Sequence, residues 1–377
     1  MSQAFSPSPL FERVERARRR KHKFRDPQIT LAHGSGGRAM HELIEGLFLE
    51  YLRNPLLETL EDQAVFEIDQ RVSAVNGNGH TRARMAFTTD SYVVDPIFFP
   101  GGDIGKLAIN GTVNDLAVSG ARPLYLSAGF ILEEGFPIDD LKKILASMRD
   151  AAAEAGVAVV TGDTKVVQKG SADKLFINTA GVGIIETAVR TSASSAKAGD
   201  KVILSGTIGD HGTTIMIARG ELELETDIES DTAPLNFLVQ EMIDEASALQ
   251  SLDGIHCLRD PTRGGVATTL NEIAFGSEVC IEIEEDLIPV REAARGACEI
   301  LGLDPLYVAN EGKLIAVVGA GIADRLVARI KQNHYGQEAC IIGEVKAEPA
   351  GIVAMRTGFG GTRIVDMLVG EQLPRIC

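Results

Sequence analysis

The sequence predicts an α/β protein of two domains with a flexible C-terminal tail. Three observations support this prediction: alternating strand-like and helix-like patterns from about Gln28 onward, a small polar segment (TSASSAKAGD) around residues 190 to 200, and a second alternating series after it. A chain of 377 residues is long enough for two domains. We therefore expect a disordered basic extension over residues 1–28, domains over residues 29–190 and 191–350, and a tail over residues 351–377.

The elements expected in the first domain follow one another closely. A glycine-rich loop over residues 33–37 leads into an amphipathic helix. A strand in RMAFTTDSYVV precedes a helix of small residues, GGDIGKLAINGTVNDLAVSGA, which ends at Gly120. A strand in PLYLSAGFIL, a helix that ends at Gly156, and strands in VAVVTGDTKVV and KLFINTAGVGII complete the domain.

The second domain repeats the alternation. It is expected to contain a strand in KVILSG, a loop in TIGDHG, and helices over residues 213–219 and 234–250. A loop and helix in RDPTRGGVATTLNEIA, a strand in KLIAVVG, a helix in ADRLVARIKQ and a strand in ACIIGEV follow. Beyond GFGGTRIVD we expect little regular structure, so the end of the chain should form a flexible arm.

The composition excludes several classes of protein. A net charge of −16 argues against nucleic acid as the main partner. No apolar run reaches the 18 or so residues that a membrane span needs, and no apolar signal core follows the basic N-terminus. We therefore expect a cytoplasmic protein that neither spans a membrane nor binds nucleic acid.

The five cysteines are Cys257, Cys280, Cys298, Cys340 and Cys377, and no two form a C-x-x-C pair. The pattern indicates neither a disulfide framework nor a clustered zinc site. Cys377 is the last residue, in EQLPRIC, where a proline cannot extend a helix or donate to a sheet. Such a thiol can travel between sites, although an accidental free thiol or an intersubunit disulfide is an open alternative.

Carboxylates stand beside glycine or amide residues at the ends of several expected elements. Hard oxygen ligands of this kind are what Mg²⁺ needs, since that ion also keeps waters and substrate phosphates. A single such aspartate is commonly a helix cap or turn residue, but a group of five favours a shared site. The five are Asp62, Asp90, Asp115, Asp163 and Asp260.

Other residues point to phosphate chemistry. The loop HGSGG offers backbone N–H groups to an anion, but the chain has no P-loop motif. Lys165 is a candidate point charge for a phosphate or a reacting amide, or else a surface lysine. Glu311, in YVANEGKL, is a candidate general base or a turn residue. His33 and His211 stand in glycine-rich loops, where a structural role is the simpler interpretation.

Together these motifs resemble the HypE family, the carbamoyl dehydratases of nickel-iron hydrogenase maturation. The resemblance rests on LAHGSGGRAM, TTDSYVVDPIFFPGGDIGKLAINGTVNDLAVSGA, VVTGDTKVV, SGTIGDHG, LRDPTRGGV, ANEGKL and the terminal LPRIC. It runs from about Ile29 to Cys377. The family is related to aminoimidazole ribonucleotide synthetase, selenophosphate synthetase and thiamine-monophosphate kinase, so the resemblance implies two α/β domains of the aminoimidazole ribonucleotide synthetase-like type.

The resemblance also implies a site. ATP would lie between the domains of a homodimer whose first-domain sheets pair. The implied nucleotide ligands are Gly34, Gly36, Gly37, Asp90, Asn114 and Asp163. The implied Mg²⁺ ligands are Asp62, Asp90, Asp115 and Asp260.

The implied reaction uses Cys377. A HypF-type carbamoyltransferase would load a carbamoyl group on this thiol, ATP would drive its dehydration to thiocyanate, and a HypC-HypD complex would accept the cyanide. We expect Glu311 to take the amide protons with help from Lys165, and Glu272 is the reserve base.

Two alternatives stay open at this point. An ATP-dependent enzyme of the same superfamily that acts on a free small molecule would not need Cys377. A scaffold whose tail docks a partner through a disulfide would need no ATP.

Overall fold

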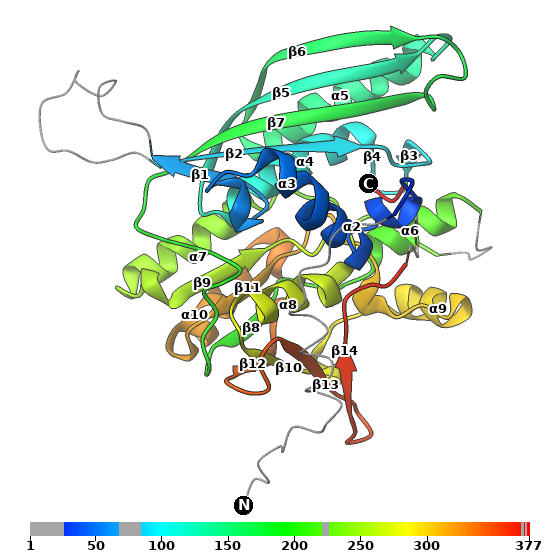
Figure 1. Ribbon diagram of the computed structural model, residues 1–377. Coiled ribbons are helices and arrows are strands. Elements are labelled where there is room, and N and C mark those ends of the chain that lie inside the picture. Colours follow the sequence, from blue (N-terminus) through cyan, green and yellow to red (C-terminus); the bar gives the residue numbers. More distant parts are fainter. Residues whose placement is uncertain (1–25, 68–83, 221–225, 371–372, 374) are drawn as a thin grey trace, which may run out of the picture.

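The computed structural model describes residues 26–67, 84–220, 226–370, 373 and 375–377. Two α/β units lie one above the other in Figure 1, and the mark for the C-terminus lies between them. The predicted basic extension falls, up to residue 25, outside the described residues. None of the helices in the described part of the chain is long and apolar enough to cross a membrane.

The first unit is a five-stranded sheet in the order β1-β2-β7-β5-β6. β2 and β7 are antiparallel, as are β5 and β7, whereas β5 and β6 are parallel. Its strands are β1 (Ala64–Glu67), β2 (Arg84–Tyr92), β5 (Arg122–Glu133), β6 (Ala158–Val167) and β7 (Leu175–Ile185). A two-residue ribbon of β3 (Phe98–Phe99) and β4 (Gly102–Asp103) precedes the first long helix.

That helix, α4 (Ile104–Val118), is sandwiched between the sheet and α5 (Ile138–Ala155). The Asp103 carboxylate caps it by accepting from the N–H groups of Gly105 and Lys106 at 2.7 and 3.0 Å. Nearly all its residues are buried, because small side chains let both neighbours pack closely. The C-terminal half of α4 therefore carries Asn114 and Asp115 to the junction between the two units.

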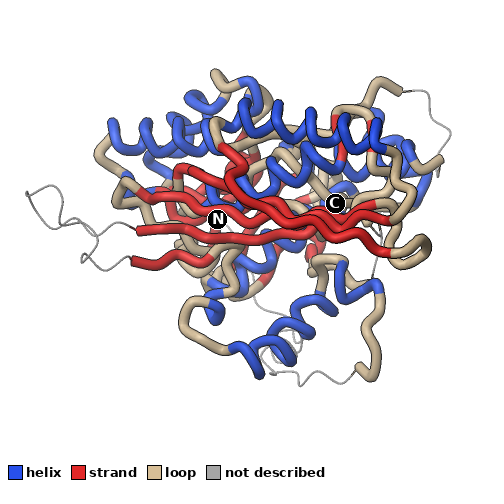
Figure 2. The backbone as a smooth tube through the Cα atoms, turned by 90° about the horizontal axis from the view of Figure 1, so that it is seen from above, coloured by secondary structure: helices blue, strands red, loops and turns tan. Residues whose placement is uncertain are grey.

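A separate group of short helices lies at the other side of the strands in Figure 2. It comprises η1 (Leu31–Gly34), α2 (Arg38–Leu43), a π-helical turn η2 (Ile44–Phe48), α3 (Leu49–Leu52) and η3 (Leu57–Thr59). The amphipathic helix predicted after the glycine loop is thus present, with a π-helical turn in its middle.

The second unit has a seven-stranded sheet in the order β14-β13-β10-β12-β8-β11-β9. Its strands are β8 (Lys201–Leu204), β9 (Ile255–Arg259), β10 (Cys280–Glu284), β11 (Ile315–Val318), β12 (Cys340–Lys346), β13 (Ile352–Arg356) and β14 (Thr362–Val365). Its longer helices are α6 (Asp210–Ala218), α7 (Asn236–Ala248), α8 (Gly265–Gly276), α9 (Glu292–Leu301) and α10 (Ala320–Ile330). Short 3-10 turns are η5 (Leu252–Gly254), η6 (Glu285–Leu287), η7 (Pro305–Tyr307) and η8 (His334–Gly336).

One apolar core joins the two units. α7 packs on α4 of the first unit and on α10 of the second, so Leu107, Leu235 and Met242 belong to the same buried cluster. Ile376 and Cys377 belong to that cluster as well. The core therefore extends to the end of the chain.

The tail predicted over residues 351–377 is wrong for its first part. β13 pairs in parallel with β10, and β14 pairs with β13 across a turn, so both strands belong to the sheet. The segment IVAMRTGFGGTRIV has apolar alternation around a glycine-rich turn, and this signal of a hairpin was present in the sequence. The described residues after β14 carry no helix or strand, as expected.

Candidate active site

The end of the chain is docked between the two units. The side chains of Ile376 and Cys377 are buried, with Cys377 8% exposed. The main-chain N–H of Val93, just after β2, donates to a terminal carboxylate oxygen of Cys377 at 3.0 Å. His211, on α6 of the second unit, contacts the Ile376 carbonyl at 2.7 Å. The last two residues, Ile376 and Cys377, are therefore held by both units at once.

Glu311 lies next to the docked thiol. The Cys377 S–H donates to the Glu311 carboxylate, while Oε1 of Glu311 has no hydrogen-bond partner in the described structure. Burial, followed by the charges of Asp231 and Asp90, raises the pKa of Glu311 well above its usual range. Burial likewise raises the pKa of Cys377, although Arg263 opposes that shift. The structure thus brings two of the predicted catalytic residues together.

The backbone around Glu311 is fixed from three sides. Its N–H donates to Asp231 Oδ1 at 3.0 Å, and its carbonyl accepts from Asn114 Nδ2 at 3.2 Å. The next residue must be glycine, because a Cβ on Gly312 would lie 1.9 Å from the Asp231 carbonyl oxygen. This local crowding explains why a glycine follows Glu311.

The side chain of Asn114 bonds to main-chain groups around Glu311. Its amide nitrogen donates to the carbonyls of Ala233 and Glu311, and its oxygen accepts from the Leu235 N–H at 2.8 Å. All of its hydrogen-bonding groups are therefore used inside the protein. This geometry favours a role in positioning Glu311 and leaves its nucleotide contact a prediction.

The four aspartates predicted to bind magnesium lie close enough to influence one another. Burial and like-charge repulsion raise the pKa of Asp62 to about 8 and that of Asp260 to about 6. The pKa of Asp115 is raised well above its usual range by burial and by repulsion from Asp260, Asp62 and Asp90. Thr88 ties the group together, since its hydroxyl lies 2.8 Å from Asp115 Oδ2 and 2.9 Å from the Asp62 carbonyl.

This donor set fits Mg²⁺ in its chemistry, because partly exposed hard oxygens that repel one another are what a divalent cation neutralises. The side chains have not converged on one point. Within residues 26–67, 84–220 and 226–370, no three His, Cys, Asp or Glu side chains form a group that could hold a metal ion. Arg259 is the nearest cation, 2.7 Å from Asp62 and 2.7 Å from Glu272.

Glu272, the reserve base, is occupied by these ion pairs. His41 Nε2 also lies 2.8 Å from its carboxylate. Burial alone would raise the pKa of Glu272, but Arg259 and His41 outweigh burial and hold it below its usual range. A carboxylate with a lowered pKa is a weak base, so this geometry favours Glu311.

The glycine loop expected to bind an anion contacts the chain itself. The N–H of Arg38, the first residue of α2, donates to the Leu368 carbonyl at 3.0 Å. A Cβ on Gly37 would lie 2.4 Å from the same carbonyl oxygen. Arg263 reaches across to the Gly34 carbonyl at 3.0 Å. The assignment of Gly34, Gly36 and Gly37 to nucleotide binding stays a prediction.

Asp163 and Lys165 are not brought to this junction. Both lie on β6, the outermost strand of the first sheet, and their side chains are 71% and 69% exposed. They pair with each other at 2.7 Å, and the hydrogen bond from Lys165 holds the pKa of Asp163 below its usual range.

Sequence reasoning missed Arg263 and Arg219. The nearness of Cys377, followed by the charges of Asp90 and Glu311, raises the pKa of Arg263, which lies 3.8 Å from Asp90. The motif RDPTRGG contains Arg263, so its position before a glycine-opened helix was a usable signal. Arg219, which binds the Arg375 carbonyl at 2.6 Å, stands in no motif that marks it.

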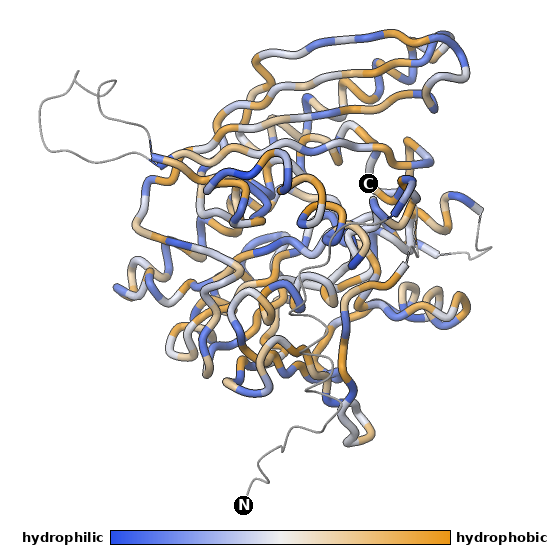
Figure 3. The backbone as a smooth tube through the Cα atoms, in the orientation of Figure 1, coloured by the Kyte–Doolittle hydropathy of each residue, from blue (hydrophilic) through white to orange (hydrophobic). Residues whose placement is uncertain are grey.

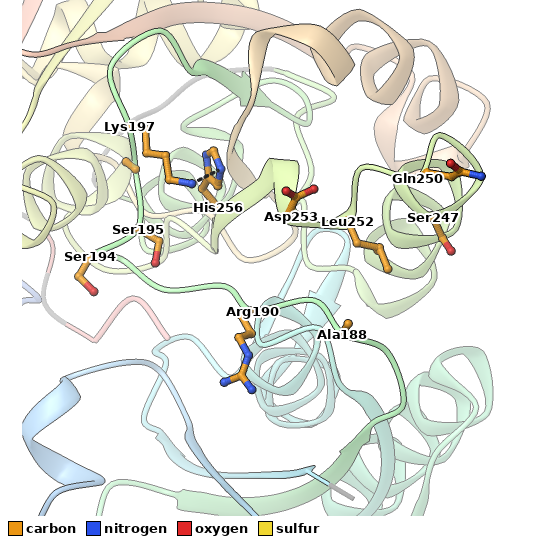
Figure 4. A pocket seen from close by; sticks show the side chains of 11 residues that line it. Ala188, Arg190, Ser194, Ser195, Lys197, Ser247, Gln250, Leu252, Asp253 and His256 are labelled. Atoms are coloured by element: carbon orange, nitrogen blue, oxygen red, sulfur yellow. Dashed lines mark hydrogen bonds between the residues drawn. The ribbon is translucent and has the colours of Figure 1, made fainter. Parts of the chain in front are cut away.

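A larger cavity lies elsewhere. Figure 4 shows it beside the linker between the units, lined by Arg190, Lys197, Asp253 and His256, with a volume of about 750 Å³. None of the predicted site residues lines it. The space left beside Cys377 and Arg263 is only about 60 Å³, so the docked tail fills most of its own site.

Comparisons with known proteins agree with this architecture. The models of the AIR synthase related protein, N-terminal domain and C-terminal domain, match residues 60–185 and 197–356. A carbamoyl dehydratase HypE of Azotobacter vinelandii is 53% identical over 94% of this chain and 98% of its own length.

Two solved structures have the same fold. A hydrogenase maturation protein HypE in complex with ATP aligns with a TM-score of 0.74 and 49% identity, covering 93% of this chain and 100% of that one. The HypE chain of a HypE-HypF complex aligns with a TM-score of 0.77 and 48% identity, covering 86% and 99%. The predicted fold class and family are thereby confirmed, and the chain belongs to the HypE family of AIR synthase related proteins.

Proposed function

We propose that this chain is an ATP-dependent carbamoyl dehydratase that converts an S-carbamoyl group on Cys377 to thiocyanate, for the cyanide ligands of iron in nickel-iron hydrogenase maturation. The observation that carries the proposal is the docking of the terminal thiol beside Glu311, inside the junction of the two units. An enzyme for a free small molecule would keep this space open for its substrate. A disulfide-linked scaffold would keep the thiol outside.

The chemistry needs a better leaving group than the carbamoyl oxygen. Transfer of the terminal phosphoryl group of ATP to this oxygen, with loss of one proton from nitrogen, gives an imidate-like phosphate and ADP. Breaking the C–O bond then releases phosphate, and loss of the second nitrogen proton forms the nitrile on sulfur. The nearness of the Glu311 carboxylate to the sulfur supports it as the group that takes these protons.

Charge at the site is balanced by nearby cations. Arg263 faces both Cys377 and Asp90, where it can neutralise negative charge that develops on the substrate. Asp62, Asp90, Asp115 and Asp260 are the residues that would hold Mg²⁺, which when bound neutralises phosphate charge.

The carrier must also leave its site. Loading by a HypF-type carbamoyltransferase and delivery to a HypC-HypD complex both require an accessible sulfur, whereas Cys377 is buried here. The relative in the HypE-HypF complex supports the first of these partners. We assign the protein to the cytoplasm, where five unpaired cysteines stay reduced.

A homodimer would complete the site. β6 is exposed along most of its length, including Val159, Val160 and Val166, and its edge has no partner strand among the described residues. Hydrophobic stretches on the outer strands appear in orange in Figure 3. A second copy on this sheet would cover them and would bring Asp163 and Lys165 to the site of the partner subunit.

Mass spectrometry of the C-terminal peptide tests the reaction. Carbamoylated protein given ATP and Mg²⁺ should lose one water from this peptide. Cys377→Ala should bind ATP and fold normally yet form no cyanide, whereas the matched variant Cys340→Ala should react like the wild type. A carbamoylated peptide that keeps its mass under these conditions would refute the dehydratase.

A further inference from the structure

The main-chain carbonyls of the last three residues, 375–377, are all bound by the protein. The Arg375 carbonyl accepts from the Arg219 guanidinium at 2.6 Å and from the Asp95 N–H at 3.2 Å. The Ile376 carbonyl accepts from His211 Nε2 at 2.7 Å. The terminal carboxylate of Cys377 accepts from the Val93 N–H. None of these contacts uses the sulfur.

Arg219 is the residue that connects the parts. It extends from the end of α6, in the second unit, and its Nε donates to the Asp95 carbonyl of the first unit at 2.5 Å. The same guanidinium therefore joins both units to the tail. Burial, with a smaller contribution from the charge of Arg219, lowers the pKa of His211. The ring is therefore neutral, donating from Nε2 to Ile376 and accepting from Ser230 at Nδ1.

The tail closes this arrangement from its own side. Arg375 Nε donates to the Val93 carbonyl at 2.8 Å, and the guanidinium pairs with Asp173. Arg375 has φ 52°, a left-handed conformation that a non-glycine residue adopts only when its surroundings hold it there. The contacts of its main chain and side chain supply that restraint.

We propose that Arg219, with His211 beside it, is a positioning clamp that docks the sulfur carrier through its main chain and so accepts the tail whatever group Cys377 carries. Free thiol, carbamoyl and cyanide states differ only at sulfur, and the hydrogen bonds described here between the clamp and the tail go to main-chain carbonyl oxygens. Discrimination among these states is left to Glu311 and Arg263, which do face the sulfur. The proposal rests on the dehydratase function only for its kinetic readout.

Two probes report docking without any catalysis. Alkylation of Cys377 by iodoacetamide, with the half-buried Cys340 as internal reference, measures exposure of the thiol. The rate of trypsin cleavage after Arg375 in the native protein measures how often the tail undocks. This probe can be applied to protein with a free Cys377 and to protein in which Cys377 has been chemically cyanylated.

Arg219→Ala should raise the rate of Cys377 alkylation, measured relative to Cys340, about 10-fold to 100-fold, because a charged donor to two carbonyls is lost. The rate of trypsin cleavage after Arg375 should rise by a similar factor relative to the wild-type protein. The trypsin effect should be the same for free and cyanylated Cys377. Arg219→Lys should give an intermediate rate, since one ammonium cannot replace a two-armed guanidinium. Arg325→Ala removes another bridging arginine, the partner of Glu245 between α10 and α7, and should change neither rate.

Single-turnover dehydration should slow in Arg219→Ala by a similar factor, while the KM for ATP and the rate of carbamoyl loading hold or improve. Unchanged alkylation and cleavage in a folded Arg219→Ala protein would overturn the clamp. If Arg219→Ala changed the cleavage rate only in protein with a free Cys377 thiol, the proposal that docking is independent of the group on Cys377 would be wrong. If both probes respond to Arg219→Ala but carbamoylated wild-type protein given ATP never loses water, the role of Arg219 in docking is supported and the dehydratase function is refuted.

Discussion

The junction around Cys377 and the outer strand β6 use the same residue types in opposite ways. At the junction, Glu311 and three of the aspartates are crowded together, and burial displaces their pKa values upward. On β6, Asp163 and Lys165 neutralise each other in solvent. Exposed pairs of this kind contribute only about 0–1 kcal/mol to stability. The junction therefore holds carboxyl groups whose ionisation is disfavoured unless a cation or another ligand offsets the repulsion, whereas β6 carries an exposed pair that is already neutralised.

Glu311→Gln is the strongest test of the junction. Without the base, dehydration of carbamoylated Cys377 should fall by about 10²–10⁴-fold while ATP binding persists. Because the pKa of Glu311 is raised, its active ionised form is lost on acidification, so the wild-type rate should decline at a pH well above the usual glutamate value of about 4.3. Single-turnover rates between pH 5 and 9 measure both effects. Full activity in the glutamine variant would show that a group other than Glu311 is the general base.

Lys165→Met tests the opposite region. A cation that acts on the partner's site should affect the rate by about 10–100-fold, and it should leave the melting temperature unchanged because its ion pair is exposed. Lys142→Met, which removes the equally exposed partner of Asp139, is the matched control and should have no effect.

Mixed dimers then locate the action of Lys165. Lys165→Met and Cys377→Ala subunits should each be inactive or slow alone. Coexpressed, they should recover activity, since the intact tail of one subunit meets the intact lysine of the other. Recovery would place Lys165 in the partner's site, and its absence would leave the lysine acting within its own subunit or outside the reaction.

The sequence was informative where chemistry stands at the end of a patterned element. Glycine at position 120 predicted the end of α4, and the strand and helix patterns placed Asp90, Asp115 and Glu311 at such ends, where the fold collects them. Two features could not be predicted from the sequence. The side chains that clamp the tail bind main-chain carbonyls, which carry no sequence pattern, and the location of Lys165 depends on a surface outside the chain. β13 and β14 were missed although their turn signal was present.

Asp115→Asn gives the smallest effect and tests whether ionisation of the junction carboxyl groups costs stability. The folded-state pKa of Asp115 is raised, so the wild-type protein loses stability as pH rises through that value, and the neutral asparagine avoids this loss. Without metal, the variant should be more stable by up to about 1 kcal/mol at pH 8, or about 2 °C in Tm, with little difference near pH 4. Added Mg²⁺ and ATP should reverse the order by stabilising the wild type more.

Glu344→Gln is the control of opposite sign, because Lys201 and Lys346 hold the pKa of Glu344 low, and loss of its carboxylate should cost more stability as pH rises. Thermal melts at both pH values decide the matter: an asparagine variant that is less stable at every pH would mean that Asp115 serves mainly as the acceptor for Thr88.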